Sequence, residues 1–489
     1  MRSCGILMHI TSLPSPYGIG TFGAEAERFA DWLRNAGQKY WQVLPIGPTG
    51  YGDSPYQPYS SFAGDPLLID LDELAENGYL ARKSVAEADY GADPTFVDYD
   101  KIRVVKLTLL REAFAGFTDD VGYTSFVMGE QDWLDDYALF MALKDKFGGK
   151  SWTEWDENIK TRDPEALKKY TEELKDEIKL QKFIQYIFWR QWDRFHRYCN
   201  KNGVQIIGDI PIYVSPDSAD VWAQPELFEL DEKLDPKRVA GVPPDLFSAT
   251  GQLWGNPLYN WEEMHNTGYR WWLKRVGRAK ENFDMLRIDH FRAFDTYYAI
   301  PFGDKTAEHG TWEKGPGMEL FNAIKNDIGD VNIIAEDLGD ISDSVRELLK
   351  DTGFPGMRVL QFGFNAENHD NEHLPHNYPV NSCAYTGTHD NMPVMQWYAE
   401  ADRDARAMAK RYLNTGMFEK FSRSCIRAVY ASPAQLAIIP MQDILGLGKD
   451  SRMNVPSTVG GNWRWRTLPG KTTDKLAAKL RALSETYFR

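Results

Sequence analysis

Three acidic residues, each following a short apolar run, could together perform acid–base chemistry. Asp289 lies in RIDHFR, Glu336 in AED and Asp390 in THDN. Cleaving a glycosidic bond with retention needs one carboxylate to attack the anomeric carbon and a second carboxyl group to protonate the departing oxygen. A third carboxylate can favour the distorted, oxocarbenium-like sugar by accepting hydrogen bonds from its ring hydroxyls. Structural ion pairs would explain any one motif about as well, but the three together predict a carbohydrate-active site.

The neighbours of two of these acids predict different protonation states. Arg287 precedes Asp289 by two residues, so both side chains point to the same face of a strand. A guanidinium fixed there would keep Asp289 ionised, as a nucleophile requires. Glu336 lies between Ala335 and Asp337 after an apolar run, and both partial burial and nearby carboxylates raise the pKa of a carboxyl group. We therefore expect Glu336 to be the proton donor.

Short apolar, β-prone runs that end in an acidic residue recur along the chain and would position these groups. The runs are VQIIGD, MLRIDH, VNIIAED, CAYTGTHD and AIIPMQD, which reach Asp209, Asp289, Glu336, Asp390 and Asp443. Each run is typical of a strand buried on both faces. The acid then lies at the carboxyl end of the strand, where parallel barrels carry their catalytic groups.

Helical patterns lie between these runs. FNAIKNDI precedes Ile333, and ISDSVRELLKDTG follows Asp337, with Ser342 as the expected N-cap and Gly353 as the expected stop. Alternating strands and helices predict an α/β fold with a parallel sheet. Because the acids are spread over several strands, we expect a closed (β/α)8 TIM barrel. An open doubly wound sheet would gather its ligands at one switch point.

Two segments interrupt this alternation within what we expect to be a single catalytic barrel over residues 1–489. Residues 66–190 carry mostly amphipathic patterns and predict a helical insertion. Residues 215–270 are rich in Pro, Trp and Gly and predict a loop-rich insertion that forms part of a substrate cleft and its lid. The final segment predicts a closing helix and no C-terminal β-sandwich domain.

Composition limits the class of protein and its partners. The chain has 489 residues, 43% of them apolar, and a formal charge of −15, which predicts a globular protein that repels nucleic acids and anionic membranes. Its 13% aromatic content suits sugar rings, which stack on aromatic planes, and suits a large core equally well. No run approaches the roughly 18 apolar residues of a membrane span, and the first residues lack a secretory signal pattern. We therefore expect a cytoplasmic protein.

Two further motifs match cofactor or metal patterns only weakly. GIGTFG, residues 18–23, fits a dinucleotide-binding pattern, but no strand precedes it. HDNEHLPH contains possible zinc ligands, but it is expected to be a loop with surface histidines; the residues are His369, Glu372, His373 and His376. The four cysteines are scattered and are expected to be buried thiols. We expect no metal and no cofactor.

The chain resembles the amylomaltases, or 4-α-glucanotransferases, which are relatives of the α-amylases. The motifs that carry the resemblance span nearly the whole sequence: TSLPSPYGIG, YWQVLPIGPTGYGDSPYQ, GDIPIYV, DSADVW, AGVPPD, GQLWGNPLY, RIDHFR, AEDLG, GMRVLQF, LPHNYP, YTGTHDN and GNWRWR. The resemblance implies a barrel with inserted subdomains, no C-terminal sandwich and no cofactor. It also implies transfer of α-1,4-glucan segments from maltooligosaccharides or amylose to the 4-hydroxyl of an acceptor glucan or glucose. An intramolecular transfer would form cyclic glucans.

The same resemblance implies a role for each matched site residue. By its place in the matching motifs, Asp289 resembles the family's nucleophile. Glu336 likewise resembles its acid/base, and Asp390 resembles its transition-state stabiliser. The residues similar to ligands of the sugar at the cleavage point are Asp209, Arg287 and His389. The residues similar to those of the glucan groove and its covering loop are Tyr56, Trp254, Asp245 and Phe247.

Several questions stay open at this point. An α-amylase-like retaining hydrolase needs the same three carboxylates, and a non-catalytic glucan-binding protein needs none. Met392 and Pro393 follow THDN where the family usually has Asp and Thr, and Asn365 stands where many members have Asp. These departures bear on acceptor preference and product size. The sequence does not decide between a monomer and a weak homodimer.

Overall fold

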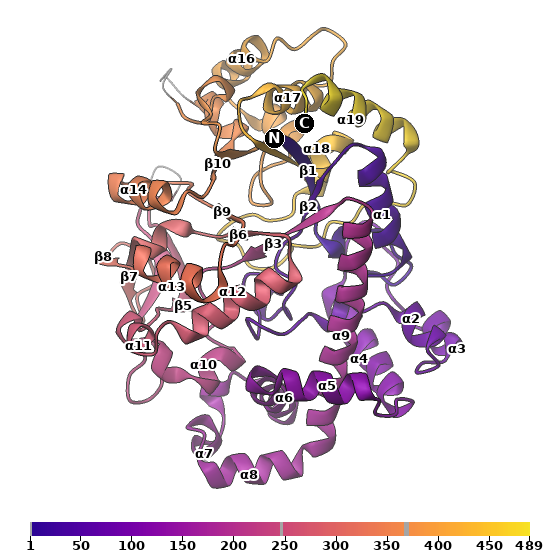
Figure 1. Ribbon diagram of the computed structural model, residues 1–489, viewed down its shortest axis with the longest axis vertical. Coiled ribbons are helices and arrows are strands. Elements are labelled where there is room, and N and C mark those ends of the chain that lie inside the picture. The colour runs from indigo at the N-terminus through magenta and orange to yellow at the C-terminus, as the bar shows by residue number, and fades with distance from the viewer. Residues whose placement is uncertain (1, 245–247, 366–370) are drawn as a thin grey trace.

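Eight parallel strands close into a barrel in the computed structural model, which describes residues 2–244, 248–365 and 371–489 (Figure 1). The barrel strands are β1 (Ser3–Leu7), β2 (Tyr40–Gln42), β3 (Gln205–Ile210), β6 (Met285–Ile288), β9 (Ile333–Ala335), β10 (Gly356–Val359), β11 (Ser382–Tyr385) and β12 (Leu436–Pro440). Their order around the barrel is β1-β12-β11-β10-β9-β6-β3-β2. Apolar side chains fill the barrel and helices cover it, so nearly every strand residue is buried. The predicted (β/α)8 fold is confirmed.

Helices surround the strands as the alternating pattern predicts. Those outside the barrel are α1 (Ala24–Asn35), α9 (Lys175–Lys201), α12 (Arg270–Asn282), α13 (Met318–Ile328), α14 (Asp343–Thr352), α17 (Phe421–Ala431) and α19 (Asp474–Thr486). Ser342 accepts a hydrogen bond from the N–H of Val345, and Gly353 ends α14 in the left-handed conformation. The sequence patterns missed β1, β2 and β10, which do not lead into an acidic residue.

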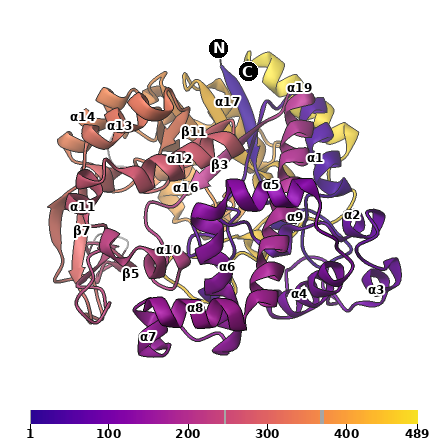
Figure 2. The ribbon, with the colours of Figure 1, turned by 60° about the horizontal axis from the view of Figure 1, so that its bottom comes forward.

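The chain between β2 and β3 forms a lobe of helices at one end of the molecule (Figures 1 and 2). They are α2 (Leu71–Glu76), α3 (Arg82–Glu87), α4 (Tyr99–Ala115), α5 (Val121–Gly129), α6 (Gln131–Lys146), α7 (Glu157–Lys160) and α8 (Pro164–Glu173). The 27-residue helix α9 joins this lobe to the barrel, packing on α6 and on α1. Its apolar stripe includes Ile184, Phe188, Trp192 and Phe195. Residue 190, the expected end of the insertion, therefore lies inside a continuous helix.

Residues 215–270 contain more regular structure than the sequence predicts. Besides α10 (Ala219–Ala223) and α11 (Trp261–Asn266), two strands occur there, β4 (Arg238–Val242) and β5 (Gln252–Pro257). They join β7 (Thr296–Pro301) and β8 (Thr311–Lys314) in a four-stranded antiparallel sheet of order β5-β4-β7-β8. The Pro and Gly residues of this segment obscured the strands, whose hydrogen-bonding partners lie partly beyond residue 270.

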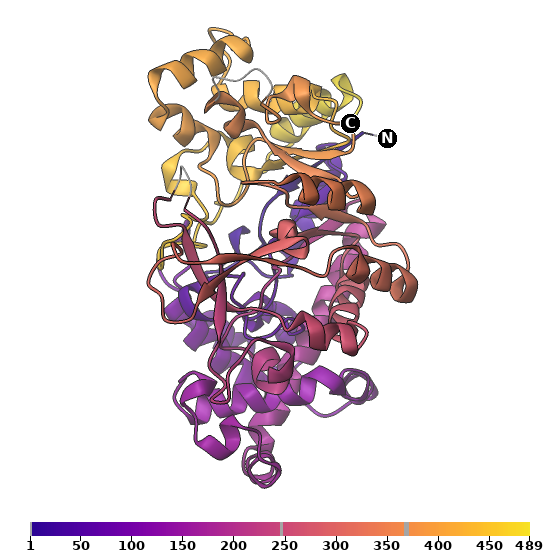
Figure 3. The same ribbon diagram turned by 90° about the vertical axis from the view of Figure 1, so that its left-hand side faces the viewer.

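The C-terminal elements lie at the opposite end of the molecule from the helical lobe (Figure 3). They include α15 (Val394–Glu400), α16 (Arg403–Tyr412) and α18 (Met441–Leu445). The two ends of the chain lie side by side. Helix α19 packs on α1, and Arg489 donates a hydrogen bond to the backbone oxygen of Ser3 at 3.1 Å. All four cysteines are buried free thiols, as expected. In the described ranges, no helix is both long and apolar enough to cross a membrane.

Candidate active site

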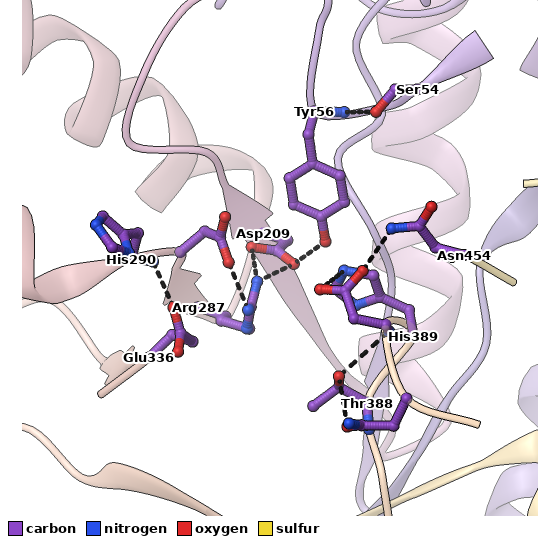
Figure 4. Close-up of polar contacts among 12 residues, drawn as sticks. Ser54, Tyr56, Asp209, Arg287, His290, Glu336, Thr388, His389 and Asn454 are labelled. Atoms are coloured by element: carbon purple, nitrogen blue, oxygen red, sulfur yellow. Dashed lines mark hydrogen bonds and ion pairs between the residues drawn. The ribbon is translucent and has the colours of Figure 1, made fainter. Parts of the chain in front are cut away.

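Three neighbouring barrel strands bring four of the predicted site residues together at their carboxyl ends (Figure 4). Asp209 lies on β3 in register with Arg287 on β6. Asp289 follows β6 directly, and Glu336 follows β9 directly, with β6 hydrogen-bonded between β3 and β9. This arrangement arises because each apolar run ends at the same edge of the barrel, where its next residue leaves the core.

Arg287 holds two carboxylates from the centre of this group. Its Nη1 donates to both oxygens of Asp209, at 2.8 and 2.7 Å, and its Nη2 donates to Oδ1 of Asp289 at 2.6 Å. The Arg287 side chain is 3% exposed and that of Asp209 is fully buried, whereas Asp289 keeps 30% of its side chain exposed. Burial alone would lower the pKa of Arg287, but Asp209 and Asp289 raise it well above its ordinary value. Asp289 is therefore oriented by a permanent positive charge and stays accessible.

Glu336 occupies an environment that favours its protonated form. Burial, followed by the negative charge of Asp289, raises the pKa of Glu336 to about 8. The lowering effects of Arg287 and of two backbone N–H groups do not cancel this increase. Those N–H groups belong to His290, 2.7 Å from Oε2, and Leu338, 2.8 Å from Oε1. At neutral pH this carboxyl group therefore holds the proton that a general acid would donate.

The backbone of His290 is what aims an N–H group at Glu336. His290 has φ 52 and ψ 50, a left-handed conformation that costs a non-glycine residue roughly 1–2 kcal/mol. Its ring meets Trp254 of β5 edge to face, with ring centroids 4.8 Å apart. Trp254, which the resemblance assigns to the substrate groove, thus lies beside the residue that follows Asp289.

Asp390 is linked to this group through Tyr56 and His389. The Tyr56 hydroxyl donates to Asp209 at 2.8 Å, and its ring stacks on His389 with centroids 5.0 Å apart (Figure 4). Nε2 of His389 lies 3.3 Å from Oδ2 of Asp390. The other carboxylate oxygen of Asp390 accepts a hydrogen bond from Asn454 at 2.6 Å, and 42% of the side chain stays exposed. One continuous set of contacts therefore runs from Glu336 to Asp390.

Comparisons with known proteins match nearly the whole chain to one family. A family model described as 4-alpha-glucanotransferase matches residues 8–471. The chain belongs to the 4-α-glucanotransferase family. The 4-alpha-glucanotransferase of Clostridium butyricum is 47% identical over 99% of this chain and 100% of its own, and that of Thermus thermophilus is 45% identical over 100% and 99%. The structure of an amylomaltase from Streptococcus agalactiae in complex with acarbose is also similar, with 43% identity, a TM-score of 0.98 and full coverage of both chains.

Two site residues implied by the family resemblance, Asp245 and Phe247, lie outside the described residues. The other eight occupy the contact network described above: Tyr56, Asp209, Trp254, Arg287, Asp289, Glu336, His389 and Asp390. Asp209 differs from the others, because its fully buried side chain already accepts hydrogen bonds from Arg287 and Tyr56.

Sequence reasoning missed three residues of this glucanotransferase site. Asn454 donates a hydrogen bond to Asp390, and the backbone N–H of His290 donates one to Glu336. The ring centroids of Trp463 and Tyr56 lie 5.7 Å apart. Trp463 lies in GNWRWR, a motif of the resemblance, so a signal for it was present. No sequence pattern marks Asn454, because its role arises only from a contact with a residue 64 positions away.

No group of metal-ligating side chains occurs in the ranges that the structure describes. In HDNEHLPH, His369 lies outside these ranges, and the other members have protein partners. Glu372 pairs with Arg346 and Arg358, and His376 is exposed and hydrogen-bonds to Tyr412. His373 is not a surface residue as expected: it is half-buried, and its Nδ1 accepts the N–H of Val359 at 3.2 Å. Burial lowers the pKa of His373 to about 4.

The pKa of Glu336 predicts the basic limb of the pH profile. A carboxyl group with a raised pKa is protonated below that value and loses its proton as the pH increases through it. Because the predicted role of Glu336 in the free enzyme is to protonate the leaving chain, kcat/KM should fall about tenfold per pH unit above about pH 8. Initial rates with maltotriose well below its KM, measured from pH 5 to 10, check this expectation. A constant kcat/KM up to pH 10 would contradict it.

Proposed function

We propose that this enzyme transfers α-1,4-glucan segments from a donor chain to the 4-hydroxyl of an acceptor glucan or glucose by retaining double displacement. Asp289 attacks the anomeric carbon and forms a covalent β-glucosyl intermediate, while Glu336 gives its proton to the departing glycosidic oxygen. Glu336 then removes the proton of the acceptor 4-hydroxyl, whose oxygen displaces Asp289. The new bond keeps the α configuration, and both carboxyl groups return to their starting states.

The observation that carries this proposal is the different surroundings of two neighbouring carboxyl groups. Asp289 is paired with Arg287 at 2.6 Å, whereas burial and the charge of Asp289 raise the pKa of Glu336 to about 8. A nucleophile must be ionised and a general acid must be protonated at the same pH. Structural ion pairs at strand ends would not require one member to keep its proton.

Asp390 suits the stabilising role because it is both fixed and accessible. Asn454 and His389 hold it, and much of its side chain can still accept hydrogen bonds from ring hydroxyls. A ring nitrogen of His389 lies 3.3 Å from Oδ2 of Asp390. We infer that Asp209 acts largely through Arg287 and Tyr56, which it holds in place.

Transfer rather than hydrolysis requires the acceptor sugar to outcompete water at the covalent intermediate. Tyr56 and Trp254 offer aromatic surfaces for an acceptor glucan. A glucan stacked on them would exclude water from the intermediate. The α-amylase-like hydrolase is the alternative, and the shared family favours the transferase.

Product analysis with maltotriose separates these two activities. A transferase should produce glucose together with a ladder of shorter and longer maltooligosaccharides, because each released segment is passed to another sugar. Chromatography of the products at low conversion provides the measurement. Glucose and maltose as the sole products would show that water is the acceptor and would overturn the transferase assignment.

A further inference from the structure

Asp443 is the one acid among the five predicted strand ends that the mechanism does not use. It lies in the first turn of α18, directly after β12, and is only 1% exposed. Its Oδ2 accepts a hydrogen bond from the Thr386 hydroxyl at 2.6 Å, and its Oδ1 accepts one from the N–H of Val394 at 2.8 Å. The side chain therefore faces the neighbouring strand β11 and the chain that follows it.

The two partners of Asp443 mark the two ends of one loop. Thr386 is the first residue after β11, and Val394 is the first residue of α15. The chain between them carries His389 and Asp390, the residues that complete the proposed site. A single carboxyl group thus joins both ends of the segment that presents the transition-state stabiliser.

The contribution of Asp443 to folding stability does not by itself explain why a carboxylate is buried at this position. Burial raises the pKa of Asp443 to about 6, although its hydrogen bonds with Thr386 and Val394 lower it, so the group is still mostly ionised at neutral pH. In the part of the chain that the structure describes, Asp443 forms no ion pair with a basic residue. Burying an unpaired charge opposes folding. The role of the Asp443 carboxylate is therefore to hold the Thr386 hydroxyl and the Val394 N–H in place.

Packing behind the loop is incomplete, which leaves the polar contacts to fix its position. A cavity of about 20 Å³ is lined by His389, Asn391 and Met392 of the loop and by Gln442 and Asp443 after β12. A void of this size holds about one water molecule and offers the loop room to shift. The chain after β12 also reaches the middle of the loop, where Arg452 donates to the backbone oxygen of Asp390 at 3.0 Å.

We propose that Asp443 is a positioning residue that sets the catalytic geometry of Asp390 by tying both ends of its loop to one carboxyl group. This inference rests on the proposed role of Asp390. Asp443 touches no reacting atom, so its contribution to turnover passes through the loop.

The test compares turnover of maltotriose by variants of Asp443. Asp443→Ala removes both ties and should lower kcat about 10- to 100-fold, because a displacement of about 1 Å in a catalytic group has an effect of that size. Asp443→Asn should stay within about fivefold of the parent, since its amide oxygen can accept the Val394 N–H and its amino group can donate to Thr386. Equal losses in the two variants would overturn the proposal.

A matched control exists in the same chain. Asp70 is 6% exposed and accepts a threonine hydroxyl, Thr21, at 2.7 Å and a backbone N–H, that of Glu73, at 3.1 Å. It has the same chemistry as Asp443 but caps α2, away from the catalytic loop. Asp70→Ala should lower the thermal unfolding midpoint as Asp443→Ala does, yet keep kcat within about twofold. A similar loss of kcat in both variants would assign the Asp443 effect to general destabilisation.

A double-mutant cycle with Asp390→Asn separates this proposal from the one on which it depends. Asp390→Asn alone should lower kcat on the order of 10³-fold, and an unchanged kcat would refute the stabilising role of Asp390 itself. Adding Asp443→Ala to Asp390→Asn should lower kcat by less than about threefold, since the pathway through Asp390 is already lost. A full further loss of 10- to 100-fold would show that Asp443 acts elsewhere.

Thr386→Val provides a second route if Asp443→Ala does not fold. It keeps the shape of a fully buried residue and removes one of the two ties. We expect a loss of about fivefold in kcat that disappears in the Asp390→Asn background. An unchanged kcat in Thr386→Val would overturn the proposal.

Discussion

Asp289→Asn should lower the kcat of maltotriose disproportionation by at least about 10,000-fold, because the amide cannot form the covalent bond to the anomeric carbon. The side chain keeps its size, and its oxygen can still accept the hydrogen bond from Arg287. Glucan affinity should therefore stay within about tenfold of the parent value. Steady-state rates and isothermal titration with a maltooligosaccharide measure the two quantities separately.

Asp295→Asn is a suitable control, because Asp295 lies six residues further along the same segment and contacts Thr296 and Ser344 instead of the site. We expect it to retain turnover within about threefold. Parent-level turnover in Asp289→Asn would eliminate the proposed nucleophile, and it would also favour a different carboxylate as the attacking group. Loss of affinity along with turnover would point to a disrupted site.

Removal of Glu336 should have an effect that depends on the leaving group. Both oxygens of Glu336 accept backbone N–H groups, so glutamine would place its amino group against one of them, and alanine is the cleaner replacement. Glu336→Ala should lower kcat/KM for maltotriose about 1,000- to 10,000-fold. Formation of the intermediate from α-maltosyl fluoride should fall by less than about tenfold, because fluoride leaves without a proton.

Azide provides the complementary observation for Glu336→Ala. The small anion fits the space left by the carboxyl group and needs no general base to attack the glycosyl-enzyme. Turnover of α-maltosyl fluoride should therefore increase with azide concentration and give α-maltosyl azide, which nuclear magnetic resonance identifies. Equal losses for both donors, or the β-azide as product, would contradict the assignment of Glu336.

The parts of the fold that sequence patterns predicted are those governed by local rules. Buried apolar runs ending in acids revealed five of the eight barrel strands, and capping chemistry located both ends of α14. The sheet formed by β4 and β5 with β7 and β8 escaped prediction, because pairing between distant segments creates it. Likewise, α9 continues through residue 190, because its apolar stripe packs against both the helical lobe and the barrel.

The same distinction applies to the site. The two-residue spacing of Arg287 and Asp289 predicted their contact, and the apolar run before Glu336 predicted its raised pKa. The hydrogen bond from Asn454 to Asp390 and the stacking of Tyr56 on His389 follow only from the three-dimensional arrangement. The acids proposed to do the chemistry are visible in the sequence, whereas the side chains that hold them in place are mostly found in the structure.

A crystal structure of the enzyme with an acarbose-like inhibitor would show whether the three acids surround one sugar ring. We expect one inhibitor ring in contact with Asp289, Glu336 and Asp390, with the carboxyl groups of Asp289 and Glu336 about 5 Å apart on opposite sides of the scissile position. A separation of about 9 Å would leave room for water and contradict retention. An inhibitor that contacts only one of the three acids would contradict the proposed site as a whole.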